Sequence, residues 1–260
     1  MSAIGIIGGS GLDNADVLSE FHEEEALAGA RDVEVETTPW GRPSSPLRRM
    51  IVSGREVYLL ARHGRAHTIP PTQVNYRANI QALKDAGCGC ILATTACGSL
   101  RQEIGRGDLV ILDQFIDFTR SRVLSFHERF EKHSPVHTPM ADPFAEPLRE
   151  KLVAACLKLG IRHHPRGTVV TIEGPRFSTR AESHMFRSFG ADVINMSVAP
   201  ECALANEAHI PYAAVAMSTD YDCWKQDEPP VTWEEILRIF TDNARKVTAV
   251  LIETIRALGA

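Results

Sequence analysis

The sequence is 260 residues long, 44% of it is hydrophobic, and its formal net charge is −5. This length and composition suffice for one α/β domain with a filled core, and we expect a single domain over residues 1–260. The acidic balance gives no general attraction to nucleic acid or to an anionic membrane, so we expect neither as a partner. A protein of this charge that binds anions must concentrate its positive charge locally.

Signals for targeting and for metal binding are also missing from the sequence. No apolar stretch approaches the roughly 20 residues that span a bilayer, and the N-terminus lacks the basic start and cleavage site of a signal peptide. The six cysteines form no CxxC pair, so we expect no metal site. The pattern favours buried free thiols and a cytoplasmic protein.

Apolar runs and turn residues alternate along the chain and predict strands separated by helices. The expected strands are residues 4–7, 47–52, 57–61, 91–95, 109–112, 168–172, 193–196 and 213–217. The expected helices are residues 75–86, 142–159 with Asp142 as N-cap, 179–190 with Thr179 opening a capping box, and a terminal helix opened by a capping box at Thr232. This order predicts a sheet with helices on both faces. Residues 118–141 lack periodicity and predict a long functional or disordered loop.

The first expected strand runs into Gly8-Gly9-Ser10-Gly11. Such a segment offers backbone N–H groups and a hydroxyl to an anion, and its glycines allow a close approach. It is not a dinucleotide fingerprint, because Asn14 stands at the third glycine position, and it is not a P-loop, because it has no lysine. A small-anion loop and a plain tight turn both stay open.

Two further segments gather polar groups at strand ends. Arg62-His63-Gly64-Arg65-Ala66-His67 concentrates basic side chains, and the planar arginine fork binds phosphate oxygens well. Thr94-Thr95-Ala96-Cys97-Gly98-Ser99 supplies hydroxyls and backbone amides. Ligands of α/β sheets favour such ends, although an exposed basic loop and a tight turn are the alternatives.

Asp220 and Asp222 follow the expected strand 213–217. They point to the same side if the strand continues, because side chains alternate with a period of two. Two carboxylates on one face suit acid–base chemistry or a metal ion, and a surface loop is a third possibility. The sequence shows no third acidic ligand nearby in a recognisable pattern, which disfavours magnesium.

Taken together, seven segments in order resemble the methylthioadenosine phosphorylases of the purine nucleoside phosphorylase superfamily. They are Gly5-Ile-Ile-Gly-Gly-Ser-Gly-Leu12, Leu60-Ala-Arg-His-Gly-Arg65, Thr94-Thr-Ala-Cys-Gly-Ser99, Asp113-Gln-Phe-Ile-Asp117, Thr171-Ile-Glu-Gly-Pro-Arg-Phe-Ser178, Asp192-Val-Ile-Asn-Met196 and Ala216-Met-Ser-Thr-Asp-Tyr-Asp-Cys-Trp-Lys225. The resemblance covers nearly the whole chain. It implies a nucleoside phosphorylase fold with a mixed central sheet flanked by helices, and usually a homotrimer. It also implies an enzyme that takes inorganic phosphate as a co-substrate and needs no cofactor.

The resemblance implies roles for individual residues as well. It assigns phosphate binding to Ser10, Arg62, His63, Thr95 and Ser197. It assigns substrate contacts to Ala96 and Phe177 at the purine, Met196 beneath the ribose, His137 in a neighbouring subunit's 5'-group pocket, and Trp233, where relatives commonly have valine. Asp220 and Asp222 look like the catalytic pair that recognises the base.

The expected reaction is phosphorolysis of S-methyl-5'-thioadenosine to adenine and 5-methylthioribose 1-phosphate. Aspartates favour adenine because a carboxylate accepts a hydrogen bond from a 6-amino group and not from a 6-oxo group. The alternatives are a phosphorylase acting mainly on adenosine or on S-methyl-5'-thioinosine, a nucleosidase that uses water, and a nucleoside-binding protein without catalysis. Adenosine stays open because many relatives carry a C-terminal segment that closes the 5' pocket, whereas this sequence ends at Ala260.

Overall fold

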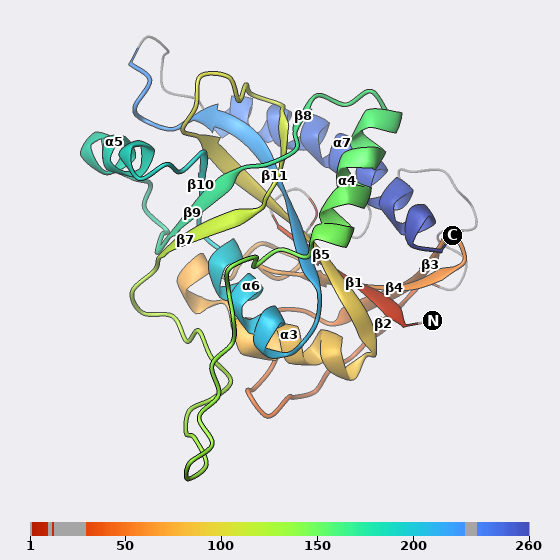
Figure 1. Cartoon of the computed structure of the whole chain (residues 1–260). Coiled ribbons are helices and arrows are strands. Elements are labelled where there is room, and N and C mark those ends of the chain that lie inside the picture. The colour runs from red at the N-terminus through yellow and green to blue at the C-terminus, as the bar shows by residue number, and fades with distance from the viewer. Residues whose placement is uncertain (1, 10–11, 13–29, 227–232, 260) are drawn as a thin grey trace.

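Strand β5 (Cys88–Ser99) organises the sheet of the computed structural model (Figure 1). It pairs in parallel with β1 (Ala3–Gly8) and β11 (Tyr212–Tyr221), and antiparallel with β10 (Val193–Asn195). The structure describes residues 2–9, 12, 30–226 and 233–259, with side chains in the last range only from residue 242.

The remaining strands extend this centre into a mixed eleven-stranded sheet. One path runs β2-β3-β4-β1-β5-β10-β9-β7, and β11, β6 and β8 branch from β5 on the other side. Their bounds are β2 Arg31–Val33, β3 Leu47–Val52, β4 Arg55–Ala61, β6 Leu109–Ile111, β7 Gln114–Phe118, β8 His163–His164 and β9 Thr168–Ile172. The mixed sheet agrees with the fold class expected from the sequence.

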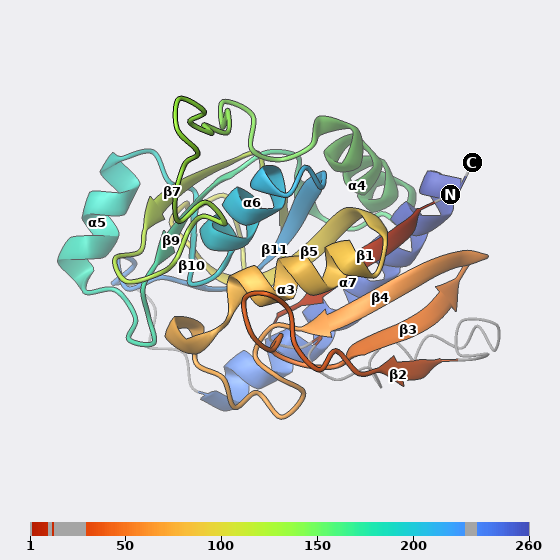
Figure 2. The ribbon, with the colours of Figure 1, turned by 90° about the horizontal axis from the view of Figure 1, so that it is seen from below.

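Helices cover both faces of the sheet, as the order of elements predicts. Figure 2 shows α3 (Tyr76–Asp85) and α6 (Val198–Glu207) on the near face and α7 (Trp233–Gly259) behind it, where α4 (Glu146–Lys158) also packs. The strands serve both cores by alternation, because Ala214 belongs to the core under α3 and α6 and Val215 to the core under α7. Helix α5 (Arg180–Ser188) lies at one end of the sheet.

Local signals formed several elements where the sequence predicts them. The β3–β4 hairpin turns at Ser53 and Gly54, which both have positive φ, as a type I′ hairpin turn requires. Asn75 caps α3 by accepting from the amide of Ala78. Thr179 and Glu182 form the capping box of α5.

The predicted start of α4 at Asp142 is wrong. The helix begins at Glu146, with Ala145 as its N-cap and a proline in its first turn. The segment before it is tied to α6 instead, because the carbonyl of Pro143 accepts a hydrogen bond from the side-chain amide of Asn206 at 2.8 Å. The capping box predicted at Thr232 lies outside the described residues. Among the helices that the structure describes, none is long and apolar enough to cross a membrane.

Candidate active site

A cavity of about 420 Å³ lies where β5 exchanges one neighbour for another. On one edge, β5 pairs with β1 up to Ala93 and with β10 only at Gly98 and Ser99. Between these two contacts the strand is released from the ladder on that edge, and residues 95–98 line the cavity. The pocket is therefore built into a fork of the sheet, at strand ends, where ligands of α/β proteins commonly bind.

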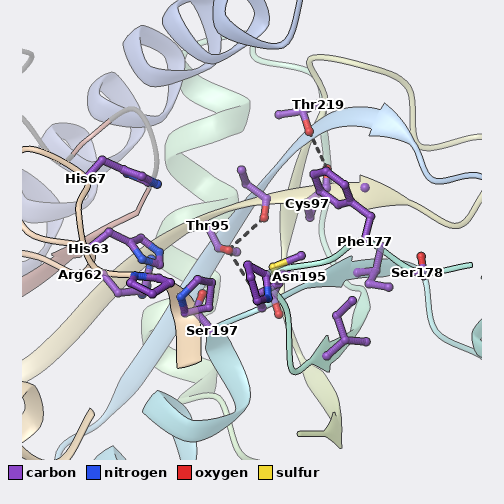
Figure 3. Close-up of a pocket in the computed structure, with 18 of the residues that line it drawn as sticks. Arg62, His63, His67, Thr95, Cys97, Phe177, Ser178, Asn195, Ser197 and Thr219 are labelled. Carbon is purple, nitrogen blue, oxygen red and sulfur yellow. Dashed lines mark hydrogen bonds between the residues drawn. The ribbon is translucent and has the colours of Figure 1, made fainter. Parts of the chain in front are cut away.

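Most of the residues predicted for the site meet in this cavity (Figure 3). Nine of them line it: Arg62, His63, Thr95, Ala96, Phe177, Met196, Ser197, Asp220 and Asp222. Figure 3 shows Arg62, His63 and Ser197 at one end and Phe177 with Ser178 at the other. Ser10 and the side chain of Trp233 lie outside the described residues. In the described chain, His137 does not line the cavity.

Arg62, at the end of β4, is held by a buried carboxylate. Its Nε and Nη2 donate to the two carboxylate oxygens of Glu201 on α6, the second at 2.8 Å, and its Nη1 donates to the carbonyl of Thr94 at 2.9 Å. Burial opposes the charged form of Arg62, but the charge and hydrogen bonds of Glu201 outweigh it and raise the pKa of the guanidinium. Tyr212 donates to the same carboxylate at 2.9 Å. The arginine therefore enters the cavity already oriented.

Gly9 makes room for that arginine. A Cβ at this position would lie 2.5 Å from Nη1 of Arg62 and 2.8 Å from the carbonyl oxygen of Thr94. The amide of Gly9 donates to Oγ1 of Thr94 at 3.2 Å, which ties the end of β1 to β5. Within the glycine-rich start, Gly9 therefore leaves the space that the Arg62 guanidinium occupies.

The two histidines of the basic loop stand together at the same end of the cavity. The rings of His63 and His67 are 4.8 Å apart between centroids, and both residues line the cavity. Nδ1 of His63 is 2.8 Å from the carbonyl of Ile69. A carbonyl can only accept, so this nitrogen carries the proton.

Hydroxyls and an amide form the floor beside Arg62. Oγ1 of Thr95 accepts from the side chain of Asn195 at 3.2 Å, and the Asn195 oxygen in turn accepts from Thr171 at 2.7 Å. Ser197 is the N-cap residue of α6 and is buried, yet its side chain makes no capping hydrogen bond. The hydroxyl of Ser197 thus lies at the cavity, immediately before the N-terminus of α6, in a position suited to an anion.

The two aspartates have different surroundings at the far end. Burial, and to a lesser degree the charge of Asp222, raise the pKa of Asp220 above its usual value, against a hydrogen bond from Thr219. Thr219 donates to Asp220 at 2.7 Å, and Ser178 donates to Asp222 at 2.7 Å. Gly98 allows Asp220 this close approach, since a Cβ there would lie 3.1 Å from Oδ1. The pair therefore holds a carboxyl that retains its proton more readily than an exposed aspartate.

Two residues border the space between these ends. Phe177 lines the cavity with 75% of its surface exposed, so its ring stands at the mouth. Met196 follows β10 and packs on Gly174, where a Cβ would lie 2.5 Å from the Met196 sulfur.

Several site residues were missed in the sequence. They are His67, Asn195, Glu201, Thr219 and Ser178. His67 belongs to a recognised basic segment, and Asn195, Thr219 and Ser178 lie inside recognised motifs. Glu201 gave no local signal, because it meets Arg62 across 139 positions of sequence.

Comparison with known proteins gives consistent matches. A family model described as the phosphorylase superfamily matches residues 3–256. The chain is 50% identical over 254 residues to S-methyl-5'-thioadenosine phosphorylase of Danio rerio, covering 97% of this chain and 87% of that one. It is also 50% identical over 260 residues to the protein of that name from Xenopus tropicalis, covering 99% and 89%.

Solved structures match over the full length of the chain. Methylthioadenosine phosphorylase from Schistosoma mansoni, in complex with adenine, superimposes with a TM-score of 0.89 at 40% identity, covering 100% of this chain and 92% of that one. A variant of adenosine/methylthioadenosine phosphorylase from the same organism, in complex with methylthioadenosine, gives 0.87 at 39% identity, covering 100% and 93%.

Proposed function

We propose a reaction from one premise: the chain belongs to the S-methyl-5'-thioadenosine phosphorylases of the phosphorylase superfamily. It is a pentosyltransferase that cleaves S-methyl-5'-thioadenosine with phosphate, giving adenine and 5-methylthioribose 1-phosphate. The observation that carries this proposal is a single cavity with an oriented arginine at one end and a carboxyl of raised pKa at the other. Phosphorolysis needs both an anion site beside C1' of the ribose and an acid beside the leaving base.

Phosphate binds at the end of the cavity that holds Arg62. A guanidinium has five N–H groups, and the three hydrogen bonds to Glu201 and Thr94 leave one on Nη1 and one on Nη2 for a ligand. The hydroxyls of Thr95 and Ser197 and the loop residue His63 complete the expected site. Ser10 keeps its assignment to this site from the family resemblance alone.

The chemistry follows from these two ends. The bond between C1' and the purine N9 breaks, its electron pair leaves with the base, and a phosphate oxygen bonds to C1'. Positive charge grows on the sugar in the transition state, as in glycoside hydrolysis, and the anionic phosphate beneath C1' stabilises it. Holding phosphate in place also removes much of the entropy cost of bringing two reactants together. Neither step requires a cofactor, and phosphate is the co-substrate.

The leaving base receives its proton or hydrogen bond at N7 from Asp220. A general acid works best when its pKa lies near the working pH, and burial moves the pKa of Asp220 in that direction. The other oxygen of the Asp220 carboxyl accepts from the 6-amino group of adenine, and Asp222, oriented by Ser178, completes the pair that recognises the base. Ala96 and Phe177 border the purine, and Met196 lies beneath the ribose.

The pocket for the 5' group of the substrate is completed by a neighbouring subunit of a homotrimer. The segment between β7 and α4 extends from the body of the protein (Figure 1), and it carries Phe130 and Val136 with about half of their surfaces exposed. His137 lies on this segment, with its ring 5.7 Å from that of Phe130. Exposed apolar side chains beside a residue assigned to a neighbour's pocket support this arrangement. Trp233 is assigned to the same pocket. Sedimentation of the purified protein tests the homotrimer by giving the number of subunits.

The protein works in the cytoplasm, in the salvage of purine and methionine. Its six cysteines are all free thiols, as a reducing compartment allows.

The substrate assignment is tested by comparing nucleosides in phosphate buffer. The kcat/KM for cleavage of S-methyl-5'-thioadenosine is expected to exceed the kcat/KM for adenosine. It is expected to exceed the kcat/KM for S-methyl-5'-thioinosine by orders of magnitude. A faster reaction with adenosine overturns the methylthio assignment. A preference for the inosine analogue overturns the roles given to Asp220 and Asp222.

A further inference from the structure

Two walls of the cavity separate where β9 and β10 stop pairing. These parallel strands pair up to Thr171 and Asn195. The next residues, Ile172 and Met196, both line the cavity but are no longer paired with each other. The turn after Ile172 leads to Phe177 at the cavity mouth, so the distance between the two walls is no longer set by the sheet.

Arg122 fills the gap between these walls. Its Nη1 donates to the carbonyl of Met196, and its Nη2 donates to the carbonyl of Glu173 at 2.6 Å and of Ile172 at 3.4 Å. Its Nε faces the Glu173 carboxylate at 3.4 Å. The guanidinium thus takes the place of the ladder hydrogen bonds that β9 and β10 no longer make.

A third wall is connected to the same group. Nη1 of Arg122 donates to the hydroxyl of Tyr76 at 2.7 Å, and that hydroxyl donates to the carbonyl of Pro71 at 3.1 Å. Pro71 lines the cavity beside the basic loop. All five N–H groups of Arg122 therefore have acceptors, and only 2% of its side chain is exposed.

Glu173 keeps this cation in place from the other side. Its carboxylate accepts from the backbone amides of Arg120 and Ser121, at 2.5 and 3.1 Å. Burial acts against the charged carboxylate, but these hydrogen bonds and Arg122 lower the pKa of Glu173 overall. The start of the long segment after β7 is thereby clamped to the turn that leads to Phe177.

We propose that Arg122 is a positioning residue of the nucleoside site, which sets the distance of Met196 from the turn at residues 173–177. This inference rests on the proposed function. Met196 packs tightly on Gly174, so movement of either wall changes the space between the sugar contact and the base contact. Arg122 itself does not line the cavity in the described chain and acts only through these walls. A misplacement of about 1 Å in a reacting group can cost about 100-fold in rate.

The test replaces Arg122 by lysine and compares it with a matched control. Lysine keeps the charge but loses the planar fork and two of the five donors. Arg149 is the control, because its side chain is 3% exposed and also binds two carbonyls, of Leu112 and Pro165, and a carboxylate, of Glu146, away from the cavity. Both substitutions remove the same kind of structural contact.

We expect Arg122→Lys to lower kcat/KM for S-methyl-5'-thioadenosine by about tenfold or more relative to Arg149→Lys, with the KM for phosphate within about twofold of wild type. Tyr76→Phe is a milder change, because it removes one acceptor of Arg122 and the connection to Pro71 but leaves the contacts to Met196, Glu173 and Ile172. It is expected to raise the nucleoside KM by a smaller factor than Arg122→Lys and to leave the phosphate KM unchanged.

Equal losses in Arg122→Lys and Arg149→Lys overturn the positioning role, and so does a parallel rise in both KM values. If Arg122→Lys does not fold, the Tyr76→Phe result decides alone, and an unchanged nucleoside KM overturns the proposal. A wild-type protein that folds but shows no phosphorolysis overturns the proposed function instead, and this inference with it.

Discussion

Arg62 and Glu201 form a two-pronged ion pair in which the side chains are only 1% and 0% exposed. The carboxylate does not reach the cavity; it fixes the plane of the guanidinium and compensates its charge in a water-poor environment. A buried ion pair of this kind contributes orientation more reliably than stability. The proposed phosphate site therefore depends on Glu201, although Glu201 does not line the cavity in the described chain.

Substitution of Glu201 by glutamine tests this dependence. The amide N–H of glutamine faces an N–H of Arg62, and the guanidinium must turn away. We expect the KM for phosphate to rise about tenfold or more, and the free energy of unfolding in urea to fall by about 3–5 kcal/mol. Tyr212→Phe, which removes one hydrogen bond to the same carboxylate, should cost only about 1 kcal/mol. Tighter phosphate binding in Glu201→Gln would show that the carboxylate acts by neutralising charge.

Gly9 is predicted to tolerate no side chain. In Gly9→Ala the new methyl group would meet Nη1 of Arg62 and the carbonyl of Thr94, and a backbone oxygen cannot move aside cheaply. Arg62 is expected to shift, which lowers kcat/KM for phosphate by about tenfold or more. Gly105→Ala is the control, because its Cβ would make only ordinary contacts with Asp108. Similar kinetics for the two variants would contradict the claim that Arg62 needs a glycine at position 9.

Asp220→Asn is predicted to change both rate and substrate preference. The amide cannot give up a proton, so kcat/KM for S-methyl-5'-thioadenosine should fall by about 100-fold or more. Because the amide can donate to a 6-oxo group, the ratio of activities on S-methyl-5'-thioinosine and S-methyl-5'-thioadenosine should rise. Asp85→Asn on the exposed side of α3 provides a control that should leave both quantities unchanged. An unchanged ratio would exclude a role for Asp220 in reading the base.

The same variant has a signature in the dependence of stability on pH. Burial raises the folded-state pKa of Asp220 above its usual 3.8, so the folded protein retains this proton to a higher pH than the unfolded chain. The stability linked to that proton is complete below the unfolded pKa and is lost as pH rises through the folded value. Asp220→Asn removes this loss, and its melting temperature relative to wild type should increase as the pH rises above 3.8, the ordinary aspartate value. A difference that is constant or falls with pH would contradict the raised pKa.

The sequence predicted those parts of the fold that carry local signals. Strand β9 has the predicted bounds, and Thr179 opens α5 with the expected capping box. Helix α6 was not predicted, because seven of its ten residues are buried and it shows no amphipathic alternation. The strand expected at residues 91–95 was predicted too short, and a tight turn was left open for the residues after it. Residues 96–99 continue β5, since β10 and β11 pair with them.

In the candidate site, too, the residues with a local sequence signal were predicted and those without one were not. Nine predicted residues line the cavity because they lie in short motifs at strand ends, where topology brings them together. Glu201 and Arg122 escaped prediction because they act on partners far away in the sequence, Arg62 and Met196, and only the folded chain shows those contacts.

The central claim is that phosphate attacks C1' of the nucleoside. The most direct measurement is ³¹P NMR of the protein with S-methyl-5'-thioadenosine and inorganic phosphate, with free adenine followed in the same samples. Phosphorolysis gives one equivalent of a new sugar phosphate for each adenine released, and no adenine when phosphate is omitted. Adenine released without phosphate, or without a matching organic phosphate signal, would mean that water is the nucleophile and would contradict the account.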